Sequence, residues 1–275
     1  MKPRIVLYCL LGGLPLTIPA LGAGHFVWWW LSGVLFAGSF VPIALFGPRT
    51  ALAQFAVIAP VLLITTVLCL WSEGLIFISG FSQQAVGILR GSIVMYLILA
   101  AVLAFLAPLL KLSKPVDLTP PRRFFAGGTV MVFLSGFAYV LYYLVFGAIT
   151  YQFFTRIYYP EAEQAVARLG LWFWGIQLAR GLLMTLAVVP VMLVLRMKRW
   201  QAAIVVGLLL WITGGVGPLV VPNPTMGGTQ RFIHTVEIFT QNFSLGVTAV
   251  LLFRPRAPAI AERAASEPLP AAGRT

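Results

Sequence analysis

Residues Arg231–Phe253 read RFIHTVEIFTQNFSLGVTAVLLF, and this stretch decides the class of fold. A membrane-spanning helix needs about 20 predominantly apolar residues, and the stretch has that length and character. Six polar side chains interrupt it, and at about 100° per residue they share a face about 140° wide. They are Arg231, His234, Glu237, Gln241, Ser244 and Thr248. We therefore predict a membrane helix whose polar face meets protein or a water-filled cavity, because lipid cannot solvate such groups.

The composition extends this class to the whole chain. Of its 275 residues, 60% are hydrophobic and 9% are charged, whereas a soluble domain has about 25% charged residues. We predict an all-α fold, a polytopic transmembrane helical bundle, with residues 1–253 as one transmembrane domain. Residues 254–275 are polar and rich in proline and alanine, which predicts a disordered cytoplasmic tail.

Eight apolar segments suit membrane spans, and the basic residues orient them. The segments lie near residues 5–22, 26–46, 51–71, 91–110, 124–150, 169–195, 202–220 and 231–253. With the N-terminus in the cytoplasm, 14 of the 19 basic residues fall on inner segments, as the positive-inside rule requires. We therefore expect both termini inside, in the cell (inner or plasma) membrane. The same pattern argues against nucleic acid as the partner of this chain, whose net charge is +12.

The first segment has a second interpretation. Lys2 and Arg4 precede an apolar run that ends in Ala20–Ala23, which is also the pattern of a cleaved signal peptide. Cleavage would leave seven helices with the new N-terminus outside, and every later loop would keep its side.

Arg180 falls deep inside the sixth expected span. It lies about eleven residues from the outer end, which at about 1.5 Å per residue is close to the bilayer midplane. A charge at that depth needs an anion. Of the seven acidic residues, Glu237 alone falls within an expected span. We therefore predict that Arg180 pairs with, or is bridged by water to, Glu237 or Gln241, with Gln177 on the same face.

Two interpretations of this arrangement remain open. In the first, it is a structural ion pair that locks the bundle. In the second, it lines an outward-facing pocket where Arg180 binds a carboxylate or phosphate. The candidate substrate-binding residues are Arg180, Gln177, His234, Glu237, Gln241 and Arg231.

The spacing of His234 and Glu237 places both on one helix face. His25 and Glu73 are candidates to join them at the outer mouth. Two ligands are too few for a closed metal site, so we predict no metal centre and consider a proton relay instead. Glu73 is expected outside the third span, where it would form an exposed pair with Arg90. The segment EAEQAVAR, residues 161–168, is expected to be a helix, either a solvated surface or a lid over the pocket.

Three functions fit these features. The first is a carrier or binding component for a small anionic solute. The second is a membrane-embedded enzyme acting on a lipid-linked or phosphate-bearing substrate at the outer leaflet, with His234 and Glu237 as acid and base. The third is a structural or assembly subunit whose polar face contacts another membrane protein. The sequence has no HExxH, GxSxG or Walker A motif and indicates no particular cofactor.

Overall fold

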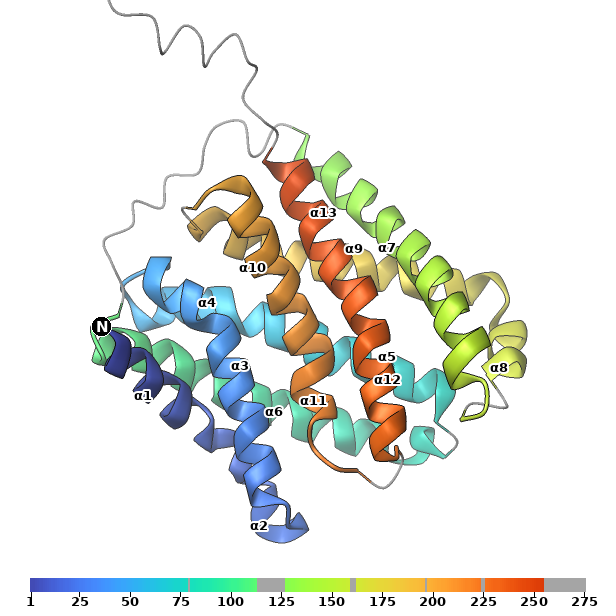
Figure 1. The fold of residues 1–275 in the computed structure, drawn as a ribbon, viewed down its shortest axis with the longest axis horizontal. Coiled ribbons are helices and arrows are strands. Elements are labelled where there is room, and N and C mark those ends of the chain that lie inside the picture. Colours follow the sequence, from blue (N-terminus) through green and yellow to red (C-terminus); the bar gives the residue numbers. More distant parts are fainter. Residues whose placement is uncertain (79, 113–126, 159–161, 196, 224–225, 255–275) are drawn as a thin grey trace, which may run out of the picture.

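The computed structural model describes residues 1–78, 80–112, 127–158, 162–195, 197–223 and 226–254. All regular structure within these ranges is helical (Figure 1). Seven helical runs among them are long and apolar enough to cross a membrane. They are Phe26–Phe46, Ala51–Phe77, Phe81–Leu109, Gly128–Thr155, Leu171–Val194, Arg199–Leu219 and Gly228–Phe253. The prediction of a multi-pass helical membrane protein is confirmed at this level, and the expected tail after Arg254 lies outside the described residues.

The first expected span consists of three short helices instead of one. They are α1 (Lys2–Gly12), the 3₁₀ turn η1 (Leu14–Thr17) and α2 (Ala20–Ala23). Pro15 and Pro19 lie at the breaks, where proline removes a backbone donor and resists regular helix. The segment packs along α3 (Phe26–Phe46), and Tyr8 and Leu16 are fully buried in the core. The N-terminal segment is therefore part of the bundle in this structure.

The third and fourth spans are longer than the sequence predicts. The third span comprises α4 (Ala51–Val61), the π-helical η2 (Leu62–Leu68) and α5 (Cys69–Phe77), and the fourth is α6 (Phe81–Leu109). The segment between the two expected spans, residues 72–90, is therefore mostly helix. As a consequence Glu73 lies inside the third span, and Arg90, its expected partner, is exposed on α6.

The second half of the chain follows the predicted order closely. It begins with α7 (Gly128–Thr150) and the π-helical η4 (Tyr151–Thr155), followed by the short amphipathic α8 (Ala162–Leu169) and then α9 (Leu171–Val194). The next run comprises α10 (Arg199–Trp211), the π-helical η5 (Ile212–Val216) and α11 (Gly217–Leu219). The last comprises α12 (Gly228–Ile238), the π-helical η6 (Phe239–Phe243) and α13 (Ser244–Phe253). Figure 1 shows this last run between α7 and α10.

Glycines allow the closest helix contacts. A Cβ atom added to Gly246 of α13 would lie 2.6 Å from the Cα of Gly207 on α10. One added to Gly181 of α9 would lie 3.1 Å from the Cα of Gly136 on α7. Small residues let membrane helices approach closely enough for dispersion forces to act, since lipid exclusion supplies little driving force. These contacts hold α13 against α10 and α9 against α7.

Three π-helical turns lie at the centre of the bundle. The Thr65 hydroxyl of η2 donates to Thr213 Oγ1 of η5 at 2.9 Å, and Thr66 donates to the Thr213 carbonyl at 2.6 Å. In η6, the Asn242 amide donates to the Leu210 carbonyl at 3.3 Å. Each π-turn adds a residue and rotates the following side chains, and such turns often occur at functional sites. The turn η6 contains Gln241, one of the predicted site residues.

Arginine side chains bind helix carbonyls at the end of the bundle where α9 and α13 finish and α10 begins. The Arg254 guanidinium, at the end of α13, donates to the carbonyl of Leu195 at 2.6 Å and to that of Met192. The Arg199 guanidinium donates to the Leu251 carbonyl at 2.7 Å. Cations at helix C-termini satisfy carbonyls that have no helical partner. The ends of α9 and α13 and the start of α10 therefore meet at one basic end.

Candidate functional site

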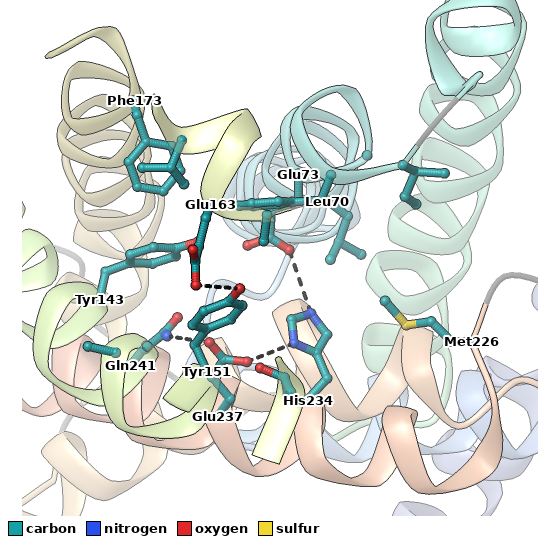
Figure 2. A pocket seen from close by; sticks show the side chains of 18 of the residues that line it. Leu70, Glu73, Tyr143, Tyr151, Glu163, Phe173, Met226, His234, Glu237 and Gln241 are labelled. Atoms are coloured by element: carbon teal, nitrogen blue, oxygen red, sulfur yellow. Dashed lines mark hydrogen bonds and ion pairs between the residues drawn. The ribbon is translucent and has the colours of Figure 1, made fainter. Parts of the chain in front are cut away.

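Six side chains form a continuous hydrogen-bonded and ionic array inside the bundle, which we call the ionic network. It comprises Gln177 and Arg180 of α9, Glu73 of α5, His234 and Glu237 of α12, and Gln241 of η6. Three of the seven spans therefore contribute to it. Figure 2 shows His234 between Glu73 and Glu237, with Gln241 beyond Glu237.

The Arg180 guanidinium forms the fixed positive end of the ionic network. Its Nη2 donates to Glu73 Oε1 at 2.5 Å, and its Nη1 donates to Gln177 Oε1 at 2.8 Å. The rings of Tyr139 and Tyr143 lie 5.8 and 6.0 Å from its Cζ, within the range of cation–π attraction. The Arg180 side chain is only 9% exposed, and its charge is already matched by a carboxylate.

His234 connects the two carboxylates of the network. Its Nδ1 lies 3.1 Å from Glu237 Oε2, and its Nε2 lies 3.8 Å from Glu73 Oε2. The amide of Gln241 donates to the other Glu237 oxygen at 3.3 Å. The side chains of His234 and Glu237 are 17% and 14% exposed. Glu237 thus has no arginine or lysine partner in the described structure, and its counter-charge depends on the protonation of His234.

A cavity of about 640 Å³ adjoins the ionic network. Its walls come from α5, α7, α8, α9, α12 and the turns beside them. Its polar lining includes Glu73, Tyr143, Tyr151, Glu163, Asn223, His234, Glu237 and Gln241. No described residue that lines it is an arginine or a lysine. The cavity is therefore acidic on its polar side and contacts Glu237 directly.

The other walls of the cavity are apolar and aromatic. Phe173 is central, with ring centroids 5.8 Å from Tyr143, 6.2 Å from Phe77 and 5.1 Å from Trp174. All four rings line the cavity, and each contact is edge-to-face. Figure 2 shows Phe173 and Tyr143 on the side of the cavity nearest Gln241.

The cavity rim carries a second, exposed ion pair. Glu163 of α8 lies 3.4 Å from Arg156 Nη2 and accepts a hydrogen bond from the Tyr151 hydroxyl at 3.2 Å. The Arg156 and Glu163 side chains are 58% and 62% exposed. Exposed pairs contribute about 0–1 kcal/mol, so this contact is weak. The helix expected at residues 161–168 corresponds to α8, which supplies part of the cavity wall.

The structure brings five of the six predicted site residues together and leaves one apart. Gln177, Arg180, His234, Glu237 and Gln241 belong to the ionic network, whereas Arg231 does not line the cavity. Its Nε and Nη1 are enclosed without a hydrogen-bond partner in the described part of the chain.

The predicted direct partner of Arg180 was wrong. Arg180 pairs with Glu73 and Gln177 instead of Glu237 or Gln241, because the third helix continues past Trp71 and places Glu73 at the depth of Arg180. An apolar run on both sides of Glu73, VLCLW before it and GLIF after it, is the signal that could have identified it.

Histidines and carboxylates meet here only in part as expected. His234, Glu237 and Glu73 lie together, but His25 is exposed at the start of α3 and does not line the cavity. Within the described residues, no group of three or more His, Cys, Asp or Glu side chains has an arrangement able to hold a metal ion. The groups that do meet here, an imidazole, two carboxylates and a guanidinium, can form ion pairs and exchange protons.

The fold and the ionic network define a class: an integral, multi-pass membrane protein with a polar site inside its helical bundle. Comparisons with models of protein families, with curated proteins and with solved structures find no match for this chain.

Proposed function

We propose that this protein is a carrier or binding component for a small organic cation, which occupies the cavity with its charge beside Glu237. The observation that carries this proposal is that Glu237 lines the cavity without an arginine or lysine partner among the described residues. A buried carboxylate needs a compensating charge, and a cationic ligand supplies one.

The aromatic wall supports an organic cation over a bare metal ion. Trimethylammonium and similar groups bind the faces of aromatic rings, with about 0.5–2 kcal/mol for each favourable contact. Phe77, Tyr143, Phe173 and Trp174 offer both such faces and an apolar surface for the body of the ligand. A volume of about 640 Å³ is within the range of small-molecule sites.

This proposal replaces the anionic solute expected from the sequence. That expectation needs a free Arg180, but its guanidinium binds Glu73 and Gln177, and Arg180 does not line the cavity. An anion in the cavity would face Glu73, Glu163 and Glu237. For the same reason we place the enzyme second, since its phosphate would need Arg180.

The assembly-subunit hypothesis is also less favoured. It needs the polar face of the last span on the outside of the bundle. Instead His234, Glu237 and Gln241 face the cavity, whereas Phe232 and Val236 are 69% and 48% exposed. Surface-exposed apolar side chains on a membrane span suit lipid.

We further propose that the protein lies in the cell membrane with its basic end in the cytoplasm. The residues there include Lys2, Arg4, Arg49, Lys111, Lys198, Arg199 and Arg254. The positive-inside rule then places the cavity at the outer face, where a solute enters from outside.

The test uses three compounds of similar size and different charge. Phenyltrimethylammonium, neutral tert-butylbenzene and anionic benzylphosphonate are titrated separately into the purified protein in detergent, and its thermal unfolding midpoint is measured. A ligand that binds the folded state raises the midpoint. We expect the cation to raise it most and benzylphosphonate to leave it unchanged. A rise with benzylphosphonate alone would contradict the proposal.

Glu237→Gln checks where the cation binds. This variant keeps the size of the side chain and removes its charge, so the shift caused by phenyltrimethylammonium should fall to that of tert-butylbenzene. Arg90→Gln is the control, because Arg90 is exposed on α6 and does not line the cavity.

A further inference from the structure

We infer that the cation and a proton exchange at the His234–Glu237 pair, so that each cation bound releases one proton. The inference rests on the proposed function and adds its energy coupling, since exchange at one site lets a proton gradient drive the movement of the cation.

The charge count of the ionic network carries the inference. The charges of Arg180 and Glu73 cancel, since the two groups lie 2.5 Å apart. The net charge of the network then depends on Glu237 and His234. With a neutral imidazole the network has a net charge of −1, and with an imidazolium it has none. A bound cation beside a neutral imidazole also gives no net charge. Because a net charge inside the bundle is costly, the network holds either the extra proton or the cation.

The leaving proton is assigned to Nδ1, because this nitrogen faces Glu237, the carboxylate that the cation approaches. His234 Nδ1 faces Glu237 at 3.1 Å, and Nε2 faces Glu73 at 3.8 Å. In the cation-free state both nitrogens carry protons. When the cation approaches Glu237, the Nδ1–H bond breaks, its electron pair stays on the nitrogen, and water in the cavity accepts the proton. The imidazole keeps its Nε2 proton towards Glu73, and no other covalent bond changes.

Neighbouring groups leave this count unchanged. The titratable and charged side chains around His234 on the packed elements are Cys69 and Glu73 of α5, Tyr139 and Tyr143 of α7, Tyr151 of η4, Glu163 of α8, Arg180 of α9, and Arg231 and Glu237 of α12. The tyrosines and Cys69 are neutral, and Glu163 pairs with Arg156 at the exposed rim. Arg231 lies one turn before His234 but outside the cavity lining. The net charge of the ionic network therefore depends on the protonation of His234, the partner of Glu237.

Calorimetry measures the released proton directly. Phenyltrimethylammonium is titrated into the purified protein between about pH 5 and pH 9, in two buffers with different ionisation enthalpies. The difference in heat gives the number of protons released. Where His234 is protonated, we expect about one proton per cation and an affinity that rises about tenfold per pH unit. At higher pH, both effects should disappear.

Two histidine variants locate the proton. In His234→Gln no imidazolium faces Glu237, so cation binding should lose the proton release and the tenfold change in affinity per pH unit that the wild type shows. The chain has two histidines, and His25→Gln is the matched control because His25 is exposed and does not line the cavity. This control should titrate like the wild type.

The results distinguish a failure of the proton exchange from a failure of the cation site. If the cation binds with the same affinity at every pH and releases no proton, the exchange is wrong and the cation site stands. A pH profile of His234→Gln identical to that of the wild type would also overturn the exchange. If phenyltrimethylammonium does not bind at any pH, both proposals fail. The wild-type titration decides the matter even where a variant does not fold.

Discussion

The Arg180 guanidinium and the Glu73 carboxylate meet at 2.5 Å, although 107 positions separate them in the chain. This contact joins α9 to α5 and neutralises Arg180, the one arginine that is buried among the described residues. Because Arg180 pairs with Glu73, the acidic character of the adjoining cavity comes from Glu237. The proposed cation site depends on Glu237 having no arginine or lysine partner among the described residues.

Replacing one member of the Arg180–Glu73 pair should destabilise the protein more than replacing both. Glu73→Gln or Arg180→Gln alone leaves a buried charge without its partner, which typically costs about 3–5 kcal/mol. The double variant leaves two neutral amides able to hydrogen-bond, so it should lose less stability than either single variant. Reversible unfolding in mixed detergent micelles measures these free energies.

The exposed pair at the cavity rim is the control for this experiment. Arg156→Gln removes one partner of Glu163, and both side chains are more than half exposed. It should change the free energy of unfolding by about 0–1 kcal/mol. If the losses of the two buried single variants simply add in the double variant, Arg180 and Glu73 are not coupled.

Removing the central aromatic ring should weaken cation binding specifically. Phe173 is 3% exposed and contacts three other cavity rings. Phe173→Leu keeps an apolar side chain but removes the ring face, so the affinity for phenyltrimethylammonium should fall about tenfold, whereas tert-butylbenzene should lose less. Titration calorimetry gives both affinities.

Phe137→Leu is the matched substitution outside the cavity. Phe137 lies on α7, is 56% exposed and does not line the cavity. Its variant should bind both compounds like the wild type. Equal losses for the charged and the neutral compound in Phe173→Leu would mean that the ring acts only by filling space.

The contact between α10 and α13 should tolerate no side chain at Gly246. A Cβ there would meet the Gly207 backbone at 2.6–2.7 Å, and backbone atoms cannot move aside without separating the helices. Gly246→Ala should therefore cost about 1–3 kcal/mol. Gly91→Ala, at a helical position of α6 with no atom within 4 Å, should be neutral or stabilise by up to about 1 kcal/mol. A neutral Gly246→Ala would show that this contact is looser than described.

Reporter fusions test the proposed orientation. Green fluorescent protein after Thr275 should fluoresce, since it folds in the cytoplasm, and alkaline phosphatase at the same position should be inactive. Phosphatase inserted after Tyr158, an exposed residue beside the cavity end, should be active. The reverse pattern would place the cavity on the cytoplasmic side.

Most of the fold could be predicted from hydropathy, because lipid requires long apolar helices whatever their tertiary contacts. The second span, Phe26–Phe46, matches its predicted bounds, and the last three spans differ by a few residues. The breaks in the N-terminal segment and the π-turns could not be placed. They depend on packing, such as the contact of Thr65 with Thr213, which a linear pattern does not contain.

The candidate site could be predicted only where its residues share one helix. His234, Glu237 and Gln241 follow from helical periodicity, and Gln177 lies three residues before Arg180. Glu73 was expected at the outer mouth and not inside the third span, because an uncompensated charge disfavours a membrane span, whereas Arg180 compensates that charge inside the bundle. Whether the cavity is acidic or basic could not be predicted from the sequence, since its charge depends on which carboxylate Arg180 neutralises.

The central claim is that a cation occupies the cavity beside Glu237, and a bound heavy-atom analogue tests it most directly. Phenyltrimethylarsonium has the shape and charge of the ammonium compound, and its arsenic gives an anomalous signal in a crystal of the complex. The account predicts one arsenic peak inside the cavity, between the Glu237 carboxylate and the Phe173 ring. An empty cavity in crystals whose arsenic peak lies elsewhere would contradict it.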